Sequence, residues 1–96
     1  MIKSVAIIFL VTLFNVKQTT EKENLYSWQI MFKDFAQCES FFNEYGDKLM
    51  NGVMDHAKRE YNKDMQIEYL SCAQVEIDDN NTNPIVLDQK VMYKID

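Results

Sequence analysis

The stretch SVAIIFLVTLF, residues 4–14, decides how much of the chain belongs to the folded domain. It carries no charge, follows Lys3, and leads into the polar segment 17–24. A single positive charge before an apolar run of this length is typical of a secretory signal peptide, and the run is short for a membrane-spanning helix. The sequence therefore predicts a signal peptide at residues 1–18, followed by a polar linker at residues 19–24.

Two alternatives remain for this segment. No Ala-x-Ala cleavage pattern follows the apolar run, so residues 1–18 also fit an uncleaved membrane anchor. A third interpretation makes the run a buried strand or helix of the domain itself. We expect export, which would make the protein secreted or periplasmic; in the anchored alternative the same segment holds it at the membrane.

Length and composition predict one small α+β domain, at residues 25–96. The chain has 96 residues, 12% of them aromatic, and a formal net charge of −5. Loss of residues 1–18 would leave eight Lys and Arg against fifteen Asp and Glu, a net charge of −7. An acidic chain without a basic stripe disfavours nucleic acid as a partner. The expected partner is another protein or a cell-envelope component.

The first half of this domain predicts a strand and then a helix. LYSWQIMF, residues 25–32, is rich in aromatic and β-favouring side chains, which indicates a first strand. Asp34 is the expected N-cap, with Gln37 at the capping-box spacing. Apolar side chains then recur at steps of three or four, which predicts one long amphipathic helix over residues 35–61.

The second half predicts a hairpin. MQIEYLSCAQVEI, residues 65–77, alternates apolar and polar side chains and is the second strand. IVLDQKVMYKI, residues 85–95, follows the turn-forming segment 78–84 and supplies an edge strand. The expected fold is β-α-β-β: a three-stranded sheet packed on one helix, with the first two strands parallel neighbours.

The two cysteines are predicted to form a disulfide. A right-handed crossover would bring Cys38, at the helix start, and Cys72, in the second strand, to the same sheet edge. An even cysteine count in a small exported chain supports this pairing, whereas two buried free thiols are the alternative. Cys72 shares the parity of Leu70, opposite to the apolar positions of its strand. That parity requires a bulge near Ser71, a sheet covered on both faces, or no bridge.

One resemblance rests on these segments. A short apolar leader, the Trp-bearing strand, FAQCESF at residues 35–41 and EYLSCAQ at residues 68–74 together resemble the small exported uncharacterised proteins of marine bacteria and their phages. The resemblance implies a β-α-β core with one disulfide. It brings no known activity and no catalytic residue with it.

Few residues suggest catalysis. His56 is the only histidine, and Glu60 lies one turn further along the predicted helix, so the two are candidates for a metal site. The alternative is a histidine on the helix face at the edge of the core. No Gly-rich phosphate loop or nucleophile elbow is present, and no cofactor is expected. We expect a binding or accessory protein; a small hydrolase or metal-dependent enzyme using His56 is the less favoured hypothesis.

Overall fold

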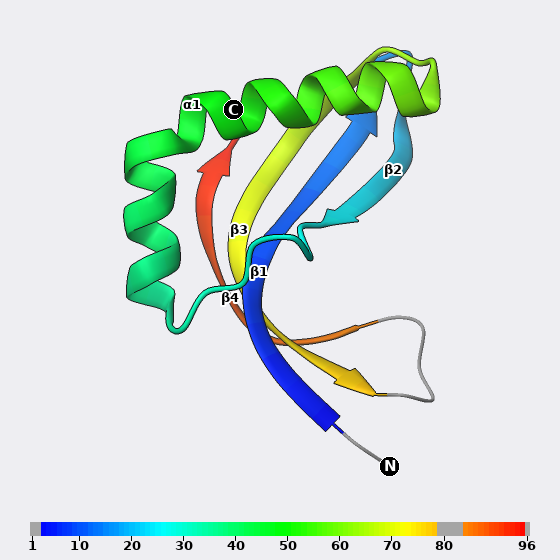
Figure 1. Cartoon of the computed structure of the whole chain (residues 1–96). Helices are drawn as coiled ribbons and strands as arrows, with labels where there is room; N and C mark the ends of the chain where they lie inside the picture. Colours follow the sequence, from blue (N-terminus) through cyan, green and yellow to red (C-terminus); the bar gives the residue numbers. More distant parts are fainter. Residues whose placement is uncertain (1–2, 79–83, 96) are drawn as a thin grey trace.

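The computed structural model describes residues 3–78 and 84–95. Across these residues it forms one four-stranded antiparallel sheet and one helix (Figure 1). The strands are β1 (Lys3–Asn15), β2 (Gln18–Tyr26), β3 (Met65–Asp78) and β4 (Ile85–Lys94), and the helix is α1 (Phe35–Tyr61). The order across the sheet is β2-β1-β3-β4.

The apolar run at residues 4–14 lies in the middle of this sheet as β1, paired with β3 along its length and with β2 over its second half. Alternate side chains of a strand point to opposite faces, and both faces of β1 are covered. Ile7, Phe9 and Val11 face α1, and Ile8 and Leu10 face the other side, all of them buried. Burial on both faces explains why consecutive residues from Ile7 to Val11 are all apolar, instead of every second one.

The predicted three-stranded sheet is therefore wrong, as is its first strand. Only Leu25 and Tyr26 of the expected strand at residues 25–32 belong to a strand, at the end of β2. The remainder is a connection to α1, tied to β1 by hydrogen bonds from the Ser27 amide to the Phe9 carbonyl (3.0 Å) and from the Phe32 amide to the Ile7 carbonyl (2.8 Å). No helix within the described residues is both long and apolar enough to cross a membrane.

β2 could not be predicted from a hydrophobic pattern, because it has none. Its sequence, QTTEKENLY, is polar until the last two residues, and most of its side chains are exposed. A tight turn at Val16 and Lys17 joins it to β1, and the Lys17 amide donates to Asn15 Oδ1 at 3.0 Å. This segment is a strand because its backbone pairs with the buried strand β1, and not because its own side chains are apolar.

α1 confirms the predicted helix and its cap. Asp34 accepts a hydrogen bond from the Gln37 amide at 2.8 Å, and Gln37 Oε1 accepts from the Lys33 amide at 2.7 Å. Asn62 ends the helix in the left-handed conformation with φ 51°. Figure 1 shows that α1 changes direction part-way along: its first part lies beside β4, and its second part crosses the ends of the other strands.

β3 and β4 confirm the predicted hairpin, although β3 also pairs with β1. The expected parallel pairing is absent among the described residues, because β1 lies between β2 and β3 and every neighbouring pair is antiparallel. The predicted turn falls largely on residues 79–83, outside the described residues. The register with β1 shifts between Thr12 and Leu13, where β3 contains an extra residue. Ile67 and Leu70 therefore both join the core beneath α1, although they are of opposite parity.

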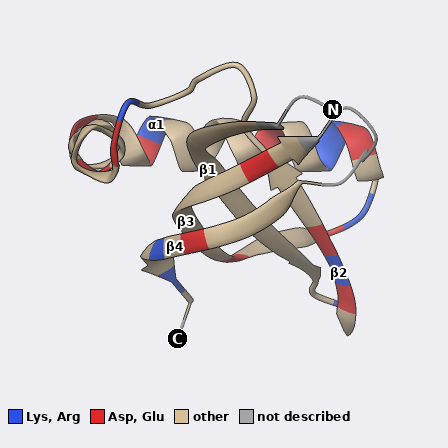
Figure 2. Ribbon diagram, turned by 90° about the horizontal axis from the view of Figure 1, so that it is seen from below, with Lys and Arg blue, Asp and Glu red and all other residues tan. Residues whose placement is uncertain are grey.

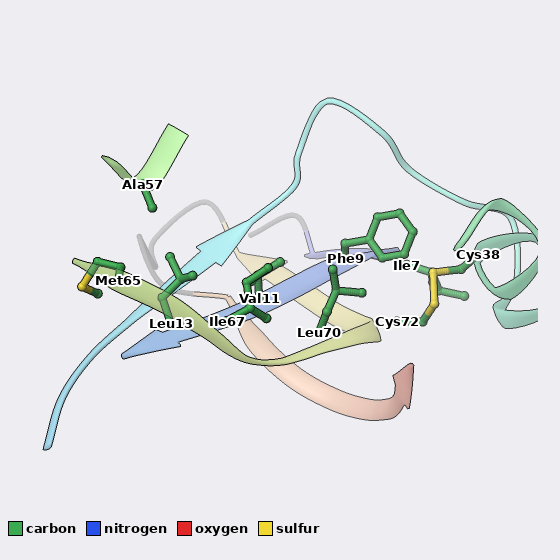
Figure 3. Close-up of a cluster of buried hydrophobic side chains, with 10 residues drawn as sticks. All are labelled: Ile7, Phe9, Val11, Leu13, Cys38, Ala57, Met65, Ile67, Leu70 and Cys72. Atoms are coloured by element: carbon green, nitrogen blue, oxygen red, sulfur yellow. A yellow bond between two sulfur atoms is a disulfide. The ribbon is translucent and has the colours of Figure 1, made fainter. Parts of the chain in front are cut away.

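Two cores result, one on each face of the sheet. The larger lies between the sheet and α1, and Figure 3 shows that Cys38 of the helix reaches it at one end and Ala57 at the other. The smaller, on the opposite face, contains Ile8, Leu10, Ala73 and Val75. A shifted register and a sheet covered on both faces together explain why Cys72 is buried although its parity is opposite to that of the apolar positions in its strand.

The position of β1 leads to a first prediction. A chain that begins at residue 19 lacks the strand that joins β2 to β3, and we expect it to lose cooperative folding, because both cores lose their central side chains. Far-UV circular dichroism and urea unfolding, compared with the full chain, test this. A truncated chain that unfolds cooperatively and forms its disulfide would show that β1 is dispensable.

Candidate functional site

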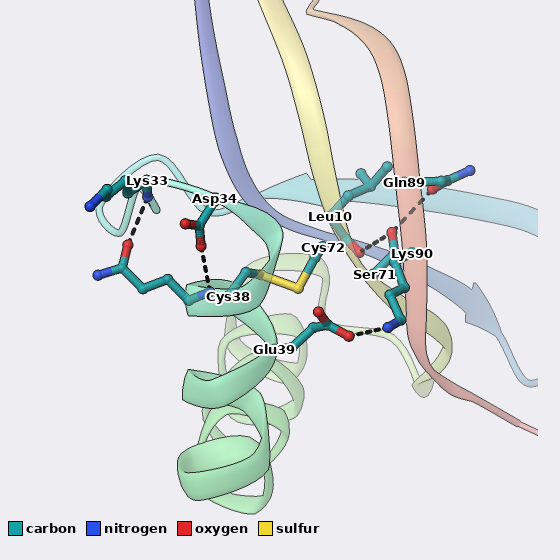
Figure 4. Close-up of a disulfide and its surroundings, with 10 residues drawn as sticks. Leu10, Lys33, Asp34, Cys38, Glu39, Ser71, Cys72, Gln89 and Lys90 are labelled. Carbon is teal, nitrogen blue, oxygen red and sulfur yellow. Dashed lines mark hydrogen bonds and ion pairs between the residues drawn. A yellow bond between two sulfur atoms is a disulfide. The ribbon is translucent and has the colours of Figure 1, made fainter.

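A disulfide joins the first turn of α1 to the sheet. Cys38, in the first turn of α1, forms a disulfide with Cys72 of β3, with Cα atoms 6.1 Å apart (Figure 4). Both residues are fully buried. The predicted disulfide is confirmed, but the predicted route to it is not, because β2, the strand before α1, is separated from β3 by β1. Cys72 is placed instead by antiparallel pairing with Phe9 and Lys90.

Polar contacts surround the bridge. Lys90 of β4 pairs with Glu39, the helix residue next to Cys38, so an ion pair and the disulfide cross the same junction. On the other face of the sheet, the Ser71 hydroxyl lies 3.1 Å from Gln89 Oε1 and 3.5 Å from the Leu10 carbonyl oxygen. The buried sulfurs have no open route for a thiol to attack, which suits a structural bridge and not a redox-active one.

The two candidate metal ligands lie one turn apart on α1. His56 and Glu60 are both exposed on the second part of α1. Among the residues that the structure describes, no group of three or more His, Cys, Asp and Glu side chains is arranged to hold a metal ion. The pKa of nearby Tyr61 is raised, mainly by burial and further by the charges of Glu23 and Glu60.

A cluster of charges fastens β2 to the end of α1. Glu21 accepts from Asn15 Nδ2 at 3.0 Å and pairs with Lys63, just beyond the helix. The hydrogen bond from Lys63, followed by that from Asn15, lowers the pKa of Glu21. The same contact with Glu21 raises the pKa of Lys63. The charges of Glu21 and Lys63 neutralise each other at the surface. The cluster therefore has a structural role: it holds β2 against the end of α1.

A groove of about 630 Å³ lies under the middle of α1 and is called here the helix groove. Its α1 wall comes from residues 48–56, of which Leu49 and Val53 are half-buried and also pack against the larger core. The sheet supplies its floor, and α1 and the connection after β2 supply its walls. The principal lining residues are Phe9, Val11, Leu25, Trp28, Leu49 and Val53, with Lys48, Gly52 and His56 completing the α1 side.

The two glycines of α1 differ in a way that bears on this groove. A glycine inside a helix costs about 1 kcal/mol relative to alanine. At Gly46 a Cβ would lie 3.2 Å from the ring of Phe42, so packing explains the small residue. At Gly52 a Cβ would meet nothing within 4 Å. Internal packing therefore does not require glycine at position 52, and its lack of a side chain leaves the groove open.

A second surface is the outer edge of the sheet along the first half of β4. Ile85, Val86 and Leu87 are 49%, 37% and 49% exposed, and Val91 further along is 49% exposed. Val5 of β1, 54% exposed, lies in the same cross-strand row as Ile85, with Glu76 between them. Large apolar side chains gathered at a strand edge are uncommon on proteins that act alone.

Sequence reasoning missed the groove, and it predicted an edge strand at residues 85–95 without its exposed apolar surface. The groove carried one usable signal, a glycine in the middle of an otherwise regular helix pattern. The β4 edge carried another, the consecutive apolar residues Ile85, Val86 and Leu87 in a strand expected to alternate. In comparisons with protein-family models, curated proteins and solved structures, nothing matched this chain.

The junction leads to a second prediction. The double variant Cys38→Ala, Cys72→Ala should lose about 4 kcal/mol of unfolding free energy, because the bridge joins residues 34 positions apart and restricts the unfolded chain. Urea unfolding with far-UV circular dichroism measures the loss, and Ser40→Ala, at an exposed position in the same turn of α1, is the control. Equal midpoints for the double variant and the wild-type chain would show that the bridge does not stabilise the fold.

Proposed function

We propose that this chain is a disulfide-stapled protein-binding module that works outside the reducing cytosol and recognises an extended strand of a partner protein along β4. The observation that carries the proposal is the unpaired outer edge of β4 with its exposed apolar side chains. A partner strand that adds to such an edge gains main-chain hydrogen bonds, and its alternate side chains meet those of the host.

The two edges of the sheet differ in how they are protected. β2 carries Glu21, Lys22 and Glu23 in succession, and Lys22 also pairs with Glu68 at 2.9 Å. Charged side chains along an edge oppose the addition of another strand. The first half of β4 has Asp88 as its single charged residue, and Figure 2 shows the same contrast, with charges crowded on β2 and sparse on the front of β4.

The lysines of β4 do not close its edge. A charged side chain at an edge can oppose strand addition, but Lys90 is engaged by Glu39 of α1. Figure 1 shows that the first half of β4 lies at the end of the sheet away from the helix. The segment from Ile85 to Asp88 therefore supplies the most accessible part of the edge.

The proposed compartment rests on the disulfide. Bridges of this kind form and persist in oxidising surroundings and are rare in the cytosol. An exported protein would meet its partner in the cell envelope or beyond it. The anchored alternative would need residues 4–14 to leave the sheet, where they supply the side chains of both cores. No arrangement of catalytic groups around His56 favours the hydrolase hypothesis.

The compartment is tested by the state of the thiols in cells. We expect the chain, recovered from its native host with free thiols blocked during lysis, to show no labelled cysteine by intact mass until it is unfolded and reduced. The measurement is made separately on cytosolic, envelope and extracellular fractions, with a cytosolic protein of known free thiols as the control. Two labelled cysteines in a cytosolic product would contradict the proposal.

The binding surface is tested with a library of short random peptides. We expect the wild-type chain to select peptides that slow amide hydrogen exchange in β4, and Leu87→Lys to weaken their binding about tenfold, because a lysine at the edge obstructs strand addition. Val16→Lys, at an exposed apolar residue in the β1–β2 turn, is the matched control and should bind normally. Peptides that bind Leu87→Lys equally well, or a selection that yields none, would count against β4.

A further inference from the structure

We propose that the helix groove is a second binding site, separate from β4, and that it takes a small amphipathic carboxylate: an aliphatic chain that ends in a carboxylate group. Its volume of about 630 Å³ lies within the range of ordinary small-molecule sites. The sheet floor and the connection after β2 are already fixed by the bonds of Ser27 and Phe32 to β1, so the groove does not need a partner to form it.

The groove fits an apolar body. Phe9 and Val11 form a floor of buried strand residues, and Leu49 and Val53 of α1 face it from one side. On the other side Trp28, 39% exposed, stacks on Tyr26 with ring centroids 5.8 Å apart. An alkyl chain can be buried between a flat aromatic wall and aliphatic side chains, because neither surface requires a hydrogen bond from it.

The rim of the groove fits an anionic end. Lys48 and His56 lie one turn before and one turn after Gly52, on the same face of α1. Lys48 is exposed and has no hydrogen-bond or ion-pair partner among the residues that the structure describes. Asp55, the acid next to His56, is paired with Arg59 at 3.3 Å. A cation without a partner beside an apolar groove favours a carboxylate over a cationic or neutral head group.

Gly52 supplies the opening. It lies between the two rim residues, and the space beyond its missing side chain is empty. A ligand that enters here can approach the helix backbone closely, which any larger residue would prevent. Gly46, six residues earlier, has no such role because Phe42 fills the space beside it.

The test uses the groove's own reporter, because Trp28 is the only tryptophan in the chain. Decanoate, below its micelle concentration, is titrated into the full oxidised protein while Trp28 emission is recorded. We expect a saturable change for decanoate, and binding roughly fivefold weaker for decanol, which keeps the alkyl chain and lacks the charge. Decyltrimethylammonium, with the opposite charge, should bind more weakly than either.

Two variants locate the site. Gly52→Leu should weaken decanoate binding by about tenfold or more by filling the opening, and it should melt no lower than wild type, because leucine is a better helix former. Lys48→Gln should reduce decanoate binding roughly fivefold and leave decanol unaffected, with Lys58→Gln on the same helix as the matched control. Absence of a saturable change, equal binding by Gly52→Leu, or no preference for the carboxylate would overturn the proposal; peptide binding at β4 is measured independently of all three.

Discussion

Burial of both faces of β1 is the constraint on which the rest of the structure depends. The strand lies between β2 and β3, and its side chains enter both cores. β2 has little apolar surface of its own and is held by its register with β1. β3 contributes to both cores because its bulge lets residues of opposite parity face α1. A small domain buries only a modest fraction of its surface. In this chain of 96 residues, the central strands bury side chains on both faces of the sheet, which increases that fraction.

α1 packs on this sheet mostly through half-buried side chains. Only Cys38, Gly46 and Ala57 of its 27 residues are buried. The disulfide and the Glu39–Lys90 pair hold the first part, and Ala57 packs at the other end of the core, near Met65. Between these attachments, half-buried side chains such as Leu49 and Val53 pack against the core and also line the helix groove.

The parts of the fold with a periodic pattern could be predicted from the sequence. The Asp34 cap, the amphipathic helix and the alternation in β3 are local signals, and the structure confirms the elements they indicate. β1 could not be recognised in the same way, because a strand buried on both faces has no alternation and reads like the apolar core of a signal peptide. β2 gave no apolar signal at all. The Cys38–Cys72 pairing was predicted correctly from an incorrect topology. The groove depends on a three-dimensional gap that no periodicity encodes.

The strand order has a consequence for synthesis. β1 is synthesised before β2, α1 and β3, yet β3 is the partner that covers most of its length; Val11, for instance, must find Leu70. Contacts so far apart in sequence form slowly, because a long loop must close before any apolar surface is gained. Until β3 has been synthesised, the nascent chain exposes the apolar side chains of β1 that will later form the centre of both cores.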